Sequence, residues 1–188
     1  MPQAEQLGQY LALLAKWNQA YNLTAVRDPS EMVVRHVLDA LAVRPWLRTP
    51  GRLADIGSGP GIPGIILAIA EPTLDVTLID SNLKMTRFAE TAIRALALPN
   101  VQVIRARVES LPADQFDQAI SRAYAATADF LSSTALLVRP GGEWLAMRGR
   151  LDVSAVPATF LSTNIIPLTV PGLAAERHLL IFQLEAAS

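Results

Sequence analysis

The chain has 188 residues, of which 51% are hydrophobic and 18% are charged, so it is long enough for one globular domain with a sizeable core. Its formal net charge of −1 argues against a protein that holds nucleic acid by bulk positive charge. The absence of cysteine excludes disulfides, thiolate zinc sites and cysteine nucleophiles. The absence of a signal peptide or a membrane-length apolar run predicts a cytoplasmic protein that does not span a membrane.

Two amphipathic helices are expected at the start of the chain. Apolar residues recur every three or four positions over residues 7–18, as on one face of a helix. A second helix start follows, where Asp28 offers an N-cap and Pro29 fits the first helical position. The apolar face of this second helix ends at residues 44–45, where a proline follows an arginine. We interpret residues 1–48 as an N-terminal helical extension.

A glycine-rich turn follows the first apolar strand. Glycine reaches φ > 0 and leaves the backbone open to a ligand, and the helix that starts after the turn presents free N–H groups. Gly57, Gly59 and Gly61 run as G-x-G-x-G behind an acid, which is typical of methyltransferases that bind S-adenosylmethionine. Gly64 keeps a dinucleotide fingerprint open as an alternative. A turn without a ligand is also possible, because glycines punctuate ordinary turns.

A second apolar strand, at residues 75–80, ends in an acid about 20 residues beyond the glycine turn. In nucleoside-binding α/β folds, an acid at this place accepts hydrogen bonds from ribose hydroxyls. We therefore expect Asp80 to bind a ribose. The alternative is that Asp80 caps the helix that follows, although Ser81 could supply that cap instead.

Strands and helices alternate from residue 49 onward, which predicts βαβ units and an α/β fold with a mostly parallel sheet between two layers of helices. The expected strands are 53–56, 76–80, 101–106, 117–121, 143–147, 164–168 and 178–184. The expected helical stretches are 62–70, 83–97 and 124–139, with a turn at 140–142. We interpret residues 1–188 as a single domain, with residues 49–188 as its Rossmann-like core.

The loops after the first four strands are expected to meet at the carboxyl edge of the sheet, where such folds bind ligands. These loops span residues 58–62, 80–81, 107–109 and 121–123, and the first of them contains Ser58. Glu109 follows the third strand, where a methyltransferase holds adenine; a solvated helix start is an equal alternative. Arg122 ends a central strand, so water or a ligand is its natural neighbour.

Several other chemistries are disfavoured. Methylation at pyrimidine C5 usually needs a cysteine nucleophile, and residues 121–124 lack the tetrad that accompanies methylation of exocyclic base amines. His36 and His178 lack metal-ligand spacing, so we expect no metal site. We expect His36 on a helix surface, as a hydrogen-bonded neighbour or, alternatively, as a substrate contact.

Six ordered motifs together resemble the RsmG (GidB) family, the small-subunit ribosomal RNA guanine-N7 methyltransferases. The motifs lie within residues 16–39, 55–64, 80–88, 107–109, 121–123 and 176–178. The resemblance implies a class I S-adenosylmethionine-dependent methyltransferase fold, Rossmann-like, with a mostly parallel seven-stranded sheet whose last pair is antiparallel. It also implies S-adenosyl-L-methionine as the cofactor. The chain starts later than is usual for the family, so we expect the family's first helix to be missing or trimmed.

The resemblance also implies site residues. The family's cofactor positions fall on Gly57, Ile62, Val108, Glu109 and Arg122, beside Ser58, Gly59, Gly61, Asp80 and Ser81 in the loops described above. The residues expected to meet RNA are Arg27, Arg35, His36, Arg148 and Arg177. The expected partner is 16S ribosomal RNA or the small ribosomal subunit, and we favour a monomeric enzyme.

Guanine N7 carries a lone pair and no hydrogen, so no general base is required and no catalytic residue is expected. Arg122, with His36 as a further candidate, would position the guanine instead. Two alternatives stay open: a methyltransferase of a small molecule, and a dinucleotide-binding module without methyl transfer.

Overall fold

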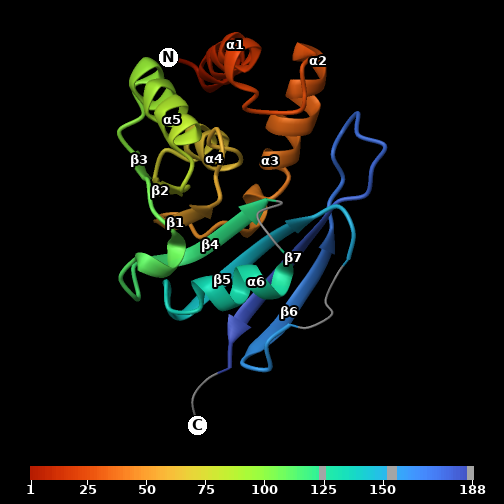
Figure 1. Cartoon of the computed structure of the whole chain (residues 1–188). Helices are drawn as coiled ribbons and strands as arrows, with labels where there is room; N and C mark the ends of the chain where they lie inside the picture. The colour runs from red at the N-terminus through yellow and green to blue at the C-terminus, as the bar shows by residue number, and fades with distance from the viewer. Residues whose placement is uncertain (123–125, 152–155, 186–188) are drawn as a thin grey trace.

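The computed structural model describes residues 1–122, 126–151 and 156–185, and within them the fold is organised by a seven-stranded sheet (Figure 1). The strands lie in the order β3-β2-β1-β4-β5-β7-β6. They are β1 (Gly51–Ile56), β2 (Leu74–Ile79), β3 (Val101–Ile104), β4 (Phe116–Arg122), β5 (Val138–Arg148), β6 (Phe160–Pro167) and β7 (His178–Leu184). Strands β1 to β5 pair in parallel, and β7 pairs antiparallel with β5 and β6. The predicted sheet is confirmed.

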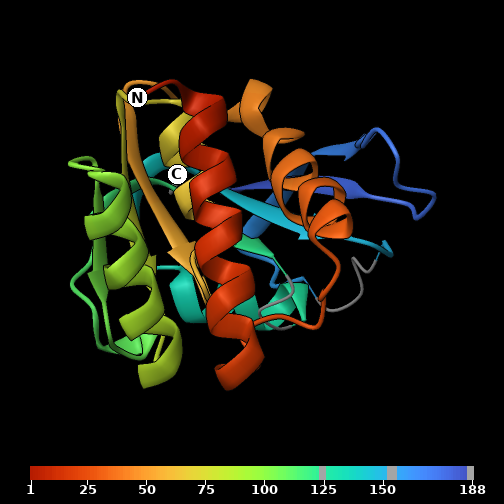
Figure 2. The same cartoon turned by 90° about the horizontal axis from the view of Figure 1, so that it is seen from above.

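Helices cover the two faces of the sheet unequally (Figures 1 and 2). One face packs against α1 (Gln3–Tyr21), α4 (Gly64–Ala70) and α5 (Leu83–Leu96), and the other against α6 (Thr127–Thr134). Successive side chains of a strand point to opposite faces. Leu145 therefore lies in the first core and Ala146 in the second, and both are fully buried. Burial on both faces explains why most residues of the central strands are apolar, with Asp55 in β1 as an exception.

The N-terminal extension is attached directly to the glycine turn. The Tyr10 hydroxyl of α1 is buried and donates a 2.9 Å hydrogen bond to the carbonyl of Pro60. The second predicted helix starts as expected, because the Asp28 carboxylate accepts hydrogen bonds from the N–H groups of Ser30 and Glu31. It consists of α2 (Pro29–Met32), a π-helical turn η1 (Val33–Leu38), α3 (Asp39–Leu41) and the 3₁₀ turn η2 (Arg44–Trp46).

The helix predicted over residues 124–139 is too long. The described part of it, α6, ends at Thr134, and β5 starts at Val138; residues 124 and 125 lie outside the described residues. The N–H groups of residues 114–116 bond to the carbonyls of Leu136 and Leu137, which pairs this segment with β4 before a helix can continue. The predicted turn at 140–142 lies inside β5, where the register with β4 shifts.

Candidate functional site

A cavity of about 380 Å³ opens at the carboxyl ends of β1, β2 and β3, and we call it the strand-end cavity. It is lined by Ile56, Gly57, Ile79, Asp80, Ser81, Ala106, Arg107, Val108 and Glu109. Val108 and Glu109 belong to the short 3₁₀ turn η3 (Val108–Ser110) that follows β3. Five of the ten predicted cofactor residues therefore meet at one cavity. Gly57, at the start of the turn 57–64, forms part of its lining.

The predicted glycines have different roles in this turn. Gly59 has φ of 56°, and a Cβ added there would meet no heavy atom within 4 Å, so a ligand can approach its backbone. Gly61 has φ of 91°, and its added Cβ would lie 2.5 Å from Cδ1 of Ile65. Gly61 is therefore required for close packing against α4. Ser58 and Ile62 are buried within the turn and do not line the cavity.

The Asp80 carboxylate connects the turn to the end of β2. Its Oδ2 accepts a 2.9 Å hydrogen bond from Gly59 N–H, and its Oδ1 accepts a 2.8 Å bond from Asn82 N–H. The N-cap of α5 is Asn82, whose side chain accepts from Lys84 N–H, so the alternative role of Asp80 or Ser81 as this cap is wrong. Each Asp80 oxygen keeps a second lone pair that can accept a hydrogen bond from a ligand.

Asp55 is a site residue that the sequence analysis missed. It lies in β1, is fully buried, and accepts a 2.8 Å hydrogen bond from Gly64 N–H through Oδ2. Its Oδ1 has no hydrogen-bond partner among the described residues. Burial raises the pKa of Asp55 to about 7, against the opposing effects of the Gly64 N–H and the Arg122 charge. The sequence did contain a signal for this residue, because an ionisable side chain within an apolar central strand is unusual.

A second hollow, of about 300 Å³, lies where β4 and β5 end, and we call it the arginine pocket. Asp39, Arg122, Met147, Arg148, Gly149 and Arg177 line it. The Asp39 side chain is only 2% exposed, and its two oxygens accept from Arg122 at 3.2 Å and from Arg177 at 2.9 Å. Two arginines thus hold one buried carboxylate, and a third, Arg148, lines the same pocket. Asp39 was not among the predicted site residues, because an acid in a helical stretch resembles a solvated surface residue.

Arg122 and His36 lie elsewhere than expected. Arg122 lines the arginine pocket and not the strand-end cavity, and it also donates a 2.8 Å hydrogen bond to the carbonyl of Arg35. The expected surface position of His36 is wrong, because its side chain is buried and its Nε2 lies 3.0 Å from Thr24 Oγ1. The π-helical turn rotates the helix faces, so His36 points inward while Val33 is 42% exposed. Burial and the nearby Arg122 charge lower the pKa of His36 to about 4.

The remaining predicted RNA residues divide into two groups. Arg148 and Arg177 meet in the arginine pocket. Arg27 and Arg35 are exposed and line neither pocket; Arg27 donates to Asn22 Oδ1 at 2.9 Å, and Arg35 lies 3.7 Å from Glu31. Residue 123, part of one predicted edge loop, lies outside the described residues.

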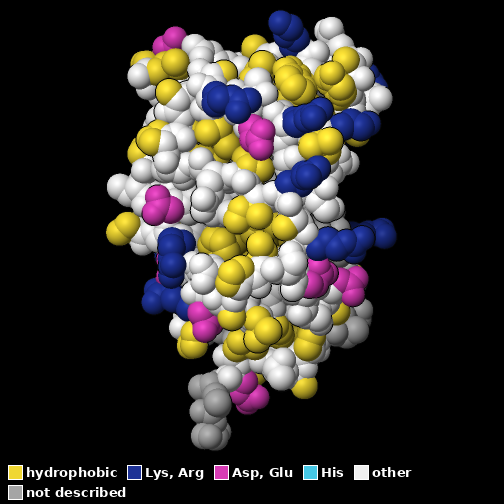
Figure 3. All heavy atoms as spheres, turned by 60° about the vertical axis from the view of Figure 1, so that its left-hand side comes forward, with side chains coloured by type: hydrophobic (Ala, Val, Ile, Leu, Met, Phe, Trp, Pro, Cys, Tyr) yellow, Lys and Arg dark blue, Asp and Glu magenta, His cyan; other side chains and the backbone are white. Residues whose placement is uncertain are grey.

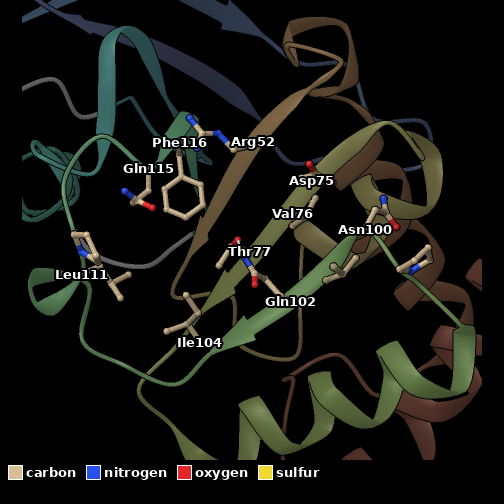
Figure 4. Close-up of a pocket in the computed structure, with 13 residues that line it drawn as sticks. Arg52, Asp75, Val76, Thr77, Asn100, Gln102, Ile104, Leu111, Gln115 and Phe116 are labelled. Atoms are coloured by element: carbon tan, nitrogen blue, oxygen red, sulfur yellow. Dashed lines mark hydrogen bonds between the residues drawn. The ribbon is translucent and has the colours of Figure 1, made fainter.

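A further hollow, of about 450 Å³, lies on the sheet face over β1, β2 and β3 (Figure 4). Its floor includes Thr77 and Gln102, whose side chains point toward each other and form a 2.8 Å hydrogen bond. It reaches Arg52 and Asp75, near the amino ends of their strands, and includes none of the predicted site residues. Because ligands of this fold class bind at carboxyl ends, we do not assign it to the reaction.

The described residues contain no group of three or more His, Cys, Asp or Glu side chains that could hold a metal ion. Within the same residues, none of the helices has the length and apolar character needed to cross a membrane.

Comparison with protein families gives a match over residues 3–180 to the GidB family, described as rRNA small subunit methyltransferase G. The chain is 49% identical to the ribosomal RNA small subunit methyltransferase G of Xanthomonas campestris pv. campestris over 183 residues, which are 95% of this chain and 85% of that protein. It is also 49% identical to the protein of the same name from Chromohalobacter salexigens, over 94% of this chain and 86% of that one.

Several solved structures with a similar fold are named as methyltransferases. A predicted O-methyltransferase from Agrobacterium tumefaciens superposes with a TM-score of 0.65 at 22% identity, covering 79% of this chain and 81% of that one. A SAM-dependent methyltransferase from Aquifex aeolicus superposes with a TM-score of 0.63 at 15% identity, covering 84% and 94%. At these identities the likeness shows the fold, and it confirms the predicted class I methyltransferase architecture.

Proposed function

We propose that this chain, which belongs to the GidB family of rRNA small subunit methyltransferase G proteins, is an enzyme that transfers the methyl group of S-adenosyl-L-methionine to N7 of a guanine in 16S ribosomal RNA. One observation carries the proposal. The strand-end cavity and the arginine pocket open on the same edge of the sheet, because β1 to β5 are parallel and both hollows lie at their carboxyl ends. Asp55 lies between them and feels the charges of both Arg122 and Asp80.

The strand-end cavity and the glycine turn beside it offer hydrogen-bond acceptors for the hydroxyl and ammonium groups of S-adenosylmethionine, which supplies a methyl group on a sulfonium centre. Asp80 can accept hydrogen bonds from ribose hydroxyls, as in other nucleoside-binding folds. Asp55 offers a buried carboxyl oxygen without a protein partner to the cofactor's ammonium group. Gly57 and Gly59, with φ of 63° and 56°, allow the ligand to approach the backbone. Val108 and Glu109 would border the adenine.

The arginine pocket suits a guanine nucleotide. Guanidinium groups bind phosphate and the O6 edge of guanine, and they stay charged at every physiological pH. Arg122 would orient the base through O6, because a donor at N7 would block the attacking lone pair. No side chain has to remove a proton, so the residues contribute by alignment, which can be worth about 7–11 kcal/mol of a barrier. Asp39 holds Arg122 and Arg177 in place before the substrate arrives.

The test is methyl transfer from isotope-labelled S-adenosylmethionine to purified small ribosomal subunits that lack the modification, followed by mass spectrometry of the nucleosides. We expect N7-methylguanosine in 16S ribosomal RNA. Label in a small molecule only, or a thermal shift with NAD and none with S-adenosylmethionine, would favour one of the two alternatives instead. Cytoplasmic location and action as a monomer belong to the same proposal.

The arginine pocket can be tested separately from the cofactor site. Arg148→Gln and Arg177→Gln should weaken RNA binding and each reduce its salt dependence by about one phosphate contact, while leaving the cofactor dissociation constant unchanged. Combined loss of cofactor and RNA binding would indicate misfolding or a shared site. RNA binding that persists in molar salt would contradict an electrostatic interface.

A further inference from the structure

The end of α1 and the first turns of α5 form a small hollow of about 160 Å³ beside the strand-end cavity. We call it the aromatic patch; it is lined by Trp17, Tyr21, Leu83, Lys84 and Arg87. The two helices lie side by side in Figure 2, and the end of α1 and the start of α5 lie at the edge toward which β1 points. Leu83 is two residues beyond Ser81, which lines the strand-end cavity. The patch therefore adjoins the proposed reaction edge.

Each of the two aromatic rings of the patch packs against a neighbouring ring, and the Tyr21 side chain is also exposed to solvent. The ring centroids of Trp17 and Tyr21 lie 5.3 Å apart with an interplanar angle of 35°. Trp17 also packs edge-on against the buried ring of Phe88, at 5.6 Å and 67°. Tyr21 is 48% exposed, and Leu83 beside it is 42% exposed. Large apolar groups held rigidly at a surface are typical of a binding site.

The patch is positively charged although the whole chain is not. Lys84 and Arg87 are exposed, and neither forms an ion pair with the described part of the chain. None of the residues described as lining the patch is acidic. Arg27 adds a third cation, because its guanidinium donates to Asn22, the residue next to Tyr21. In the upper part of Figure 3, dark blue basic side chains lie among yellow hydrophobic ones, and a magenta acidic side chain lies between them.

We propose that the aromatic patch binds an unpaired nucleotide of the RNA substrate, with its base stacked on Tyr21 and neighbouring phosphates held by Lys84 and Arg87. The inference rests on the proposed function and adds a second contact outside the two pockets. Proteins recognise unpaired RNA by stacking splayed-out bases on aromatic rings while cations neutralise the backbone. A phosphate-bearing partner also fits a surface that presents three cations, whereas an uncharged apolar partner would leave them unpaired.

The first test compares Tyr21→Leu with Tyr21→Phe, because leucine keeps an apolar side chain and phenylalanine keeps the stacking face. Loss of one base stack should weaken binding of a fluorescein-labelled ten-nucleotide single-stranded RNA by about five- to a hundredfold in Tyr21→Leu. Tyr21→Phe should bind within about twofold of wild type, since the ring is retained. With small subunits as substrate, Tyr21→Leu should raise KM and retain kcat. Equal RNA affinity of folded Tyr21→Leu and wild type would overturn the stacking role.

The second test addresses the cations. The double variant Lys84→Gln/Arg87→Gln should lower the slope of log affinity against log salt by about one to two for the same RNA. Arg94→Gln is the matched control, because Arg94 is an exposed arginine two turns further along α5 and outside the patch. Its salt slope should equal that of wild type. An unchanged slope in the double variant would overturn the phosphate contacts.

Two readouts keep this inference distinct from the proposed function. Quenching of Trp17 fluorescence by the oligonucleotide, lost in Trp17→Phe, reports the patch without methyl transfer. If wild type does not methylate small subunits but shows this quenching, the proposed function is wrong and RNA binding by the aromatic patch is still supported. If the variants lose affinity for small subunits but bind naked 16S ribosomal RNA and the oligonucleotide normally, the partner is a ribosomal protein and the inference is wrong.

Discussion

The strand-end cavity and the arginine pocket lie on one edge of the sheet but are assembled differently. The cavity is built from residues 56–109, within three consecutive strands and the loops that follow them. The pocket joins residues from 39 to 177, contributed by α3, β4, β5 and the segment before β7. A ligand site formed by neighbouring segments requires only that those strands and loops fold. A site formed by segments that are distant in the sequence requires the tertiary structure of the whole domain.

The two regions also differ in charge. The strand-end cavity is lined by two carboxyl groups, Asp80 and Glu109, against one cation, Arg107, and Asp55 adds a further carboxyl group beside the glycine turn. The arginine pocket is lined by three arginines and one buried carboxylate, Asp39, which pairs with two of them. The first region therefore suits a ligand with cationic and hydroxyl groups, and the second suits an anionic one. Each of the following changes should disturb one region and spare the other.

The largest effect is expected from Asp39→Ala. This substitution leaves Arg122 and Arg177 without their buried partner. We expect the free energy of unfolding to fall by about 2–4 kcal/mol. This is somewhat less than for a fully buried pair, because both arginines are about one-quarter exposed. Methyl transfer should be lost, while the folded fraction binds S-adenosylmethionine as wild type does. Denaturant unfolding and calorimetry would measure the two quantities.

The matched control for this prediction is Glu31→Gln, because Glu31 pairs with Arg35 at 3.7 Å on an exposed surface. It should cost no more than about 0.5–1 kcal/mol. An Asp39→Ala protein that unfolds at the wild-type denaturant concentration would show that the arginines hold the pocket without this carboxylate.

The next effect belongs to the strand-end cavity. Asp80→Ala removes an acceptor for ribose hydroxyls, and hydrogen bonds to a charged group are worth about 1.5–3 kcal/mol, so cofactor affinity should fall roughly ten- to a hundredfold. It also removes the acceptor for Gly59 N–H, which loosens the turn. RNA affinity should stay within twofold, because the arginine pocket is untouched. Calorimetry that shows wild-type cofactor affinity in a folded Asp80→Ala protein would remove Asp80 from the site.

This contrast explains which parts of the site the sequence could predict. Gly57 and Asp80 were found because strand, turn and helix follow each other directly, and the distance from turn to acid is fixed by one βαβ unit. Strand β7 was predicted with its observed bounds, because both faces of the sheet are mostly apolar; β5 and β6 start five and four residues earlier than the predicted ranges 143–147 and 164–168. Local sequence patterns were therefore sufficient to predict the sheet and the strand-end cavity.

The arginine pocket could not be predicted in the same way. Asp39 is buried against Arg122 and Arg177, which lie 83 and 138 residues away in the sequence, and no local pattern contains these contacts. The inward orientation of His36 depends on a π-helical turn, for which the sequence carries no recognised signal. Asp55 is different, because an acid within an apolar strand was visible and was not interpreted as a site residue.

A smaller effect separates the two regions by pH. Asp55 has its pKa raised from 3.8 to about 7, so near neutrality it is half protonated in the folded protein and ionised in the unfolded chain. A bound ammonium group favours the ionised form, so cofactor affinity should rise about tenfold from pH 6 to pH 8 with release of up to one proton. The guanidinium groups of the arginine pocket do not titrate there, so RNA affinity should not follow.

Calorimetry at pH 6 in two buffers of different ionisation enthalpy would count the released proton, and Asp55→Asn should abolish the release. The same shift makes the free protein less stable as pH rises from about 4 to 7, because the folded state holds a proton that the unfolded state gives up. Cofactor affinity that is constant from pH 6 to pH 8 would exclude Asp55 as the ammonium partner.

The smallest effect concerns the chemical step. With His36 neutral above about pH 5, the arginines permanently charged and N7 free of hydrogen, nothing that acts in the transfer changes its protonation in the neutral range. At saturating S-adenosylmethionine, the single-turnover rate should therefore vary by less than about twofold from pH 6 to pH 8, in wild type and in His36→Asn alike. Saturation matters, because Asp55 changes cofactor affinity over the same interval. A rate that falls steeply below pH 6.5, and no longer does so in His36→Asn, would show that His36 acts as a base despite its burial against Thr24.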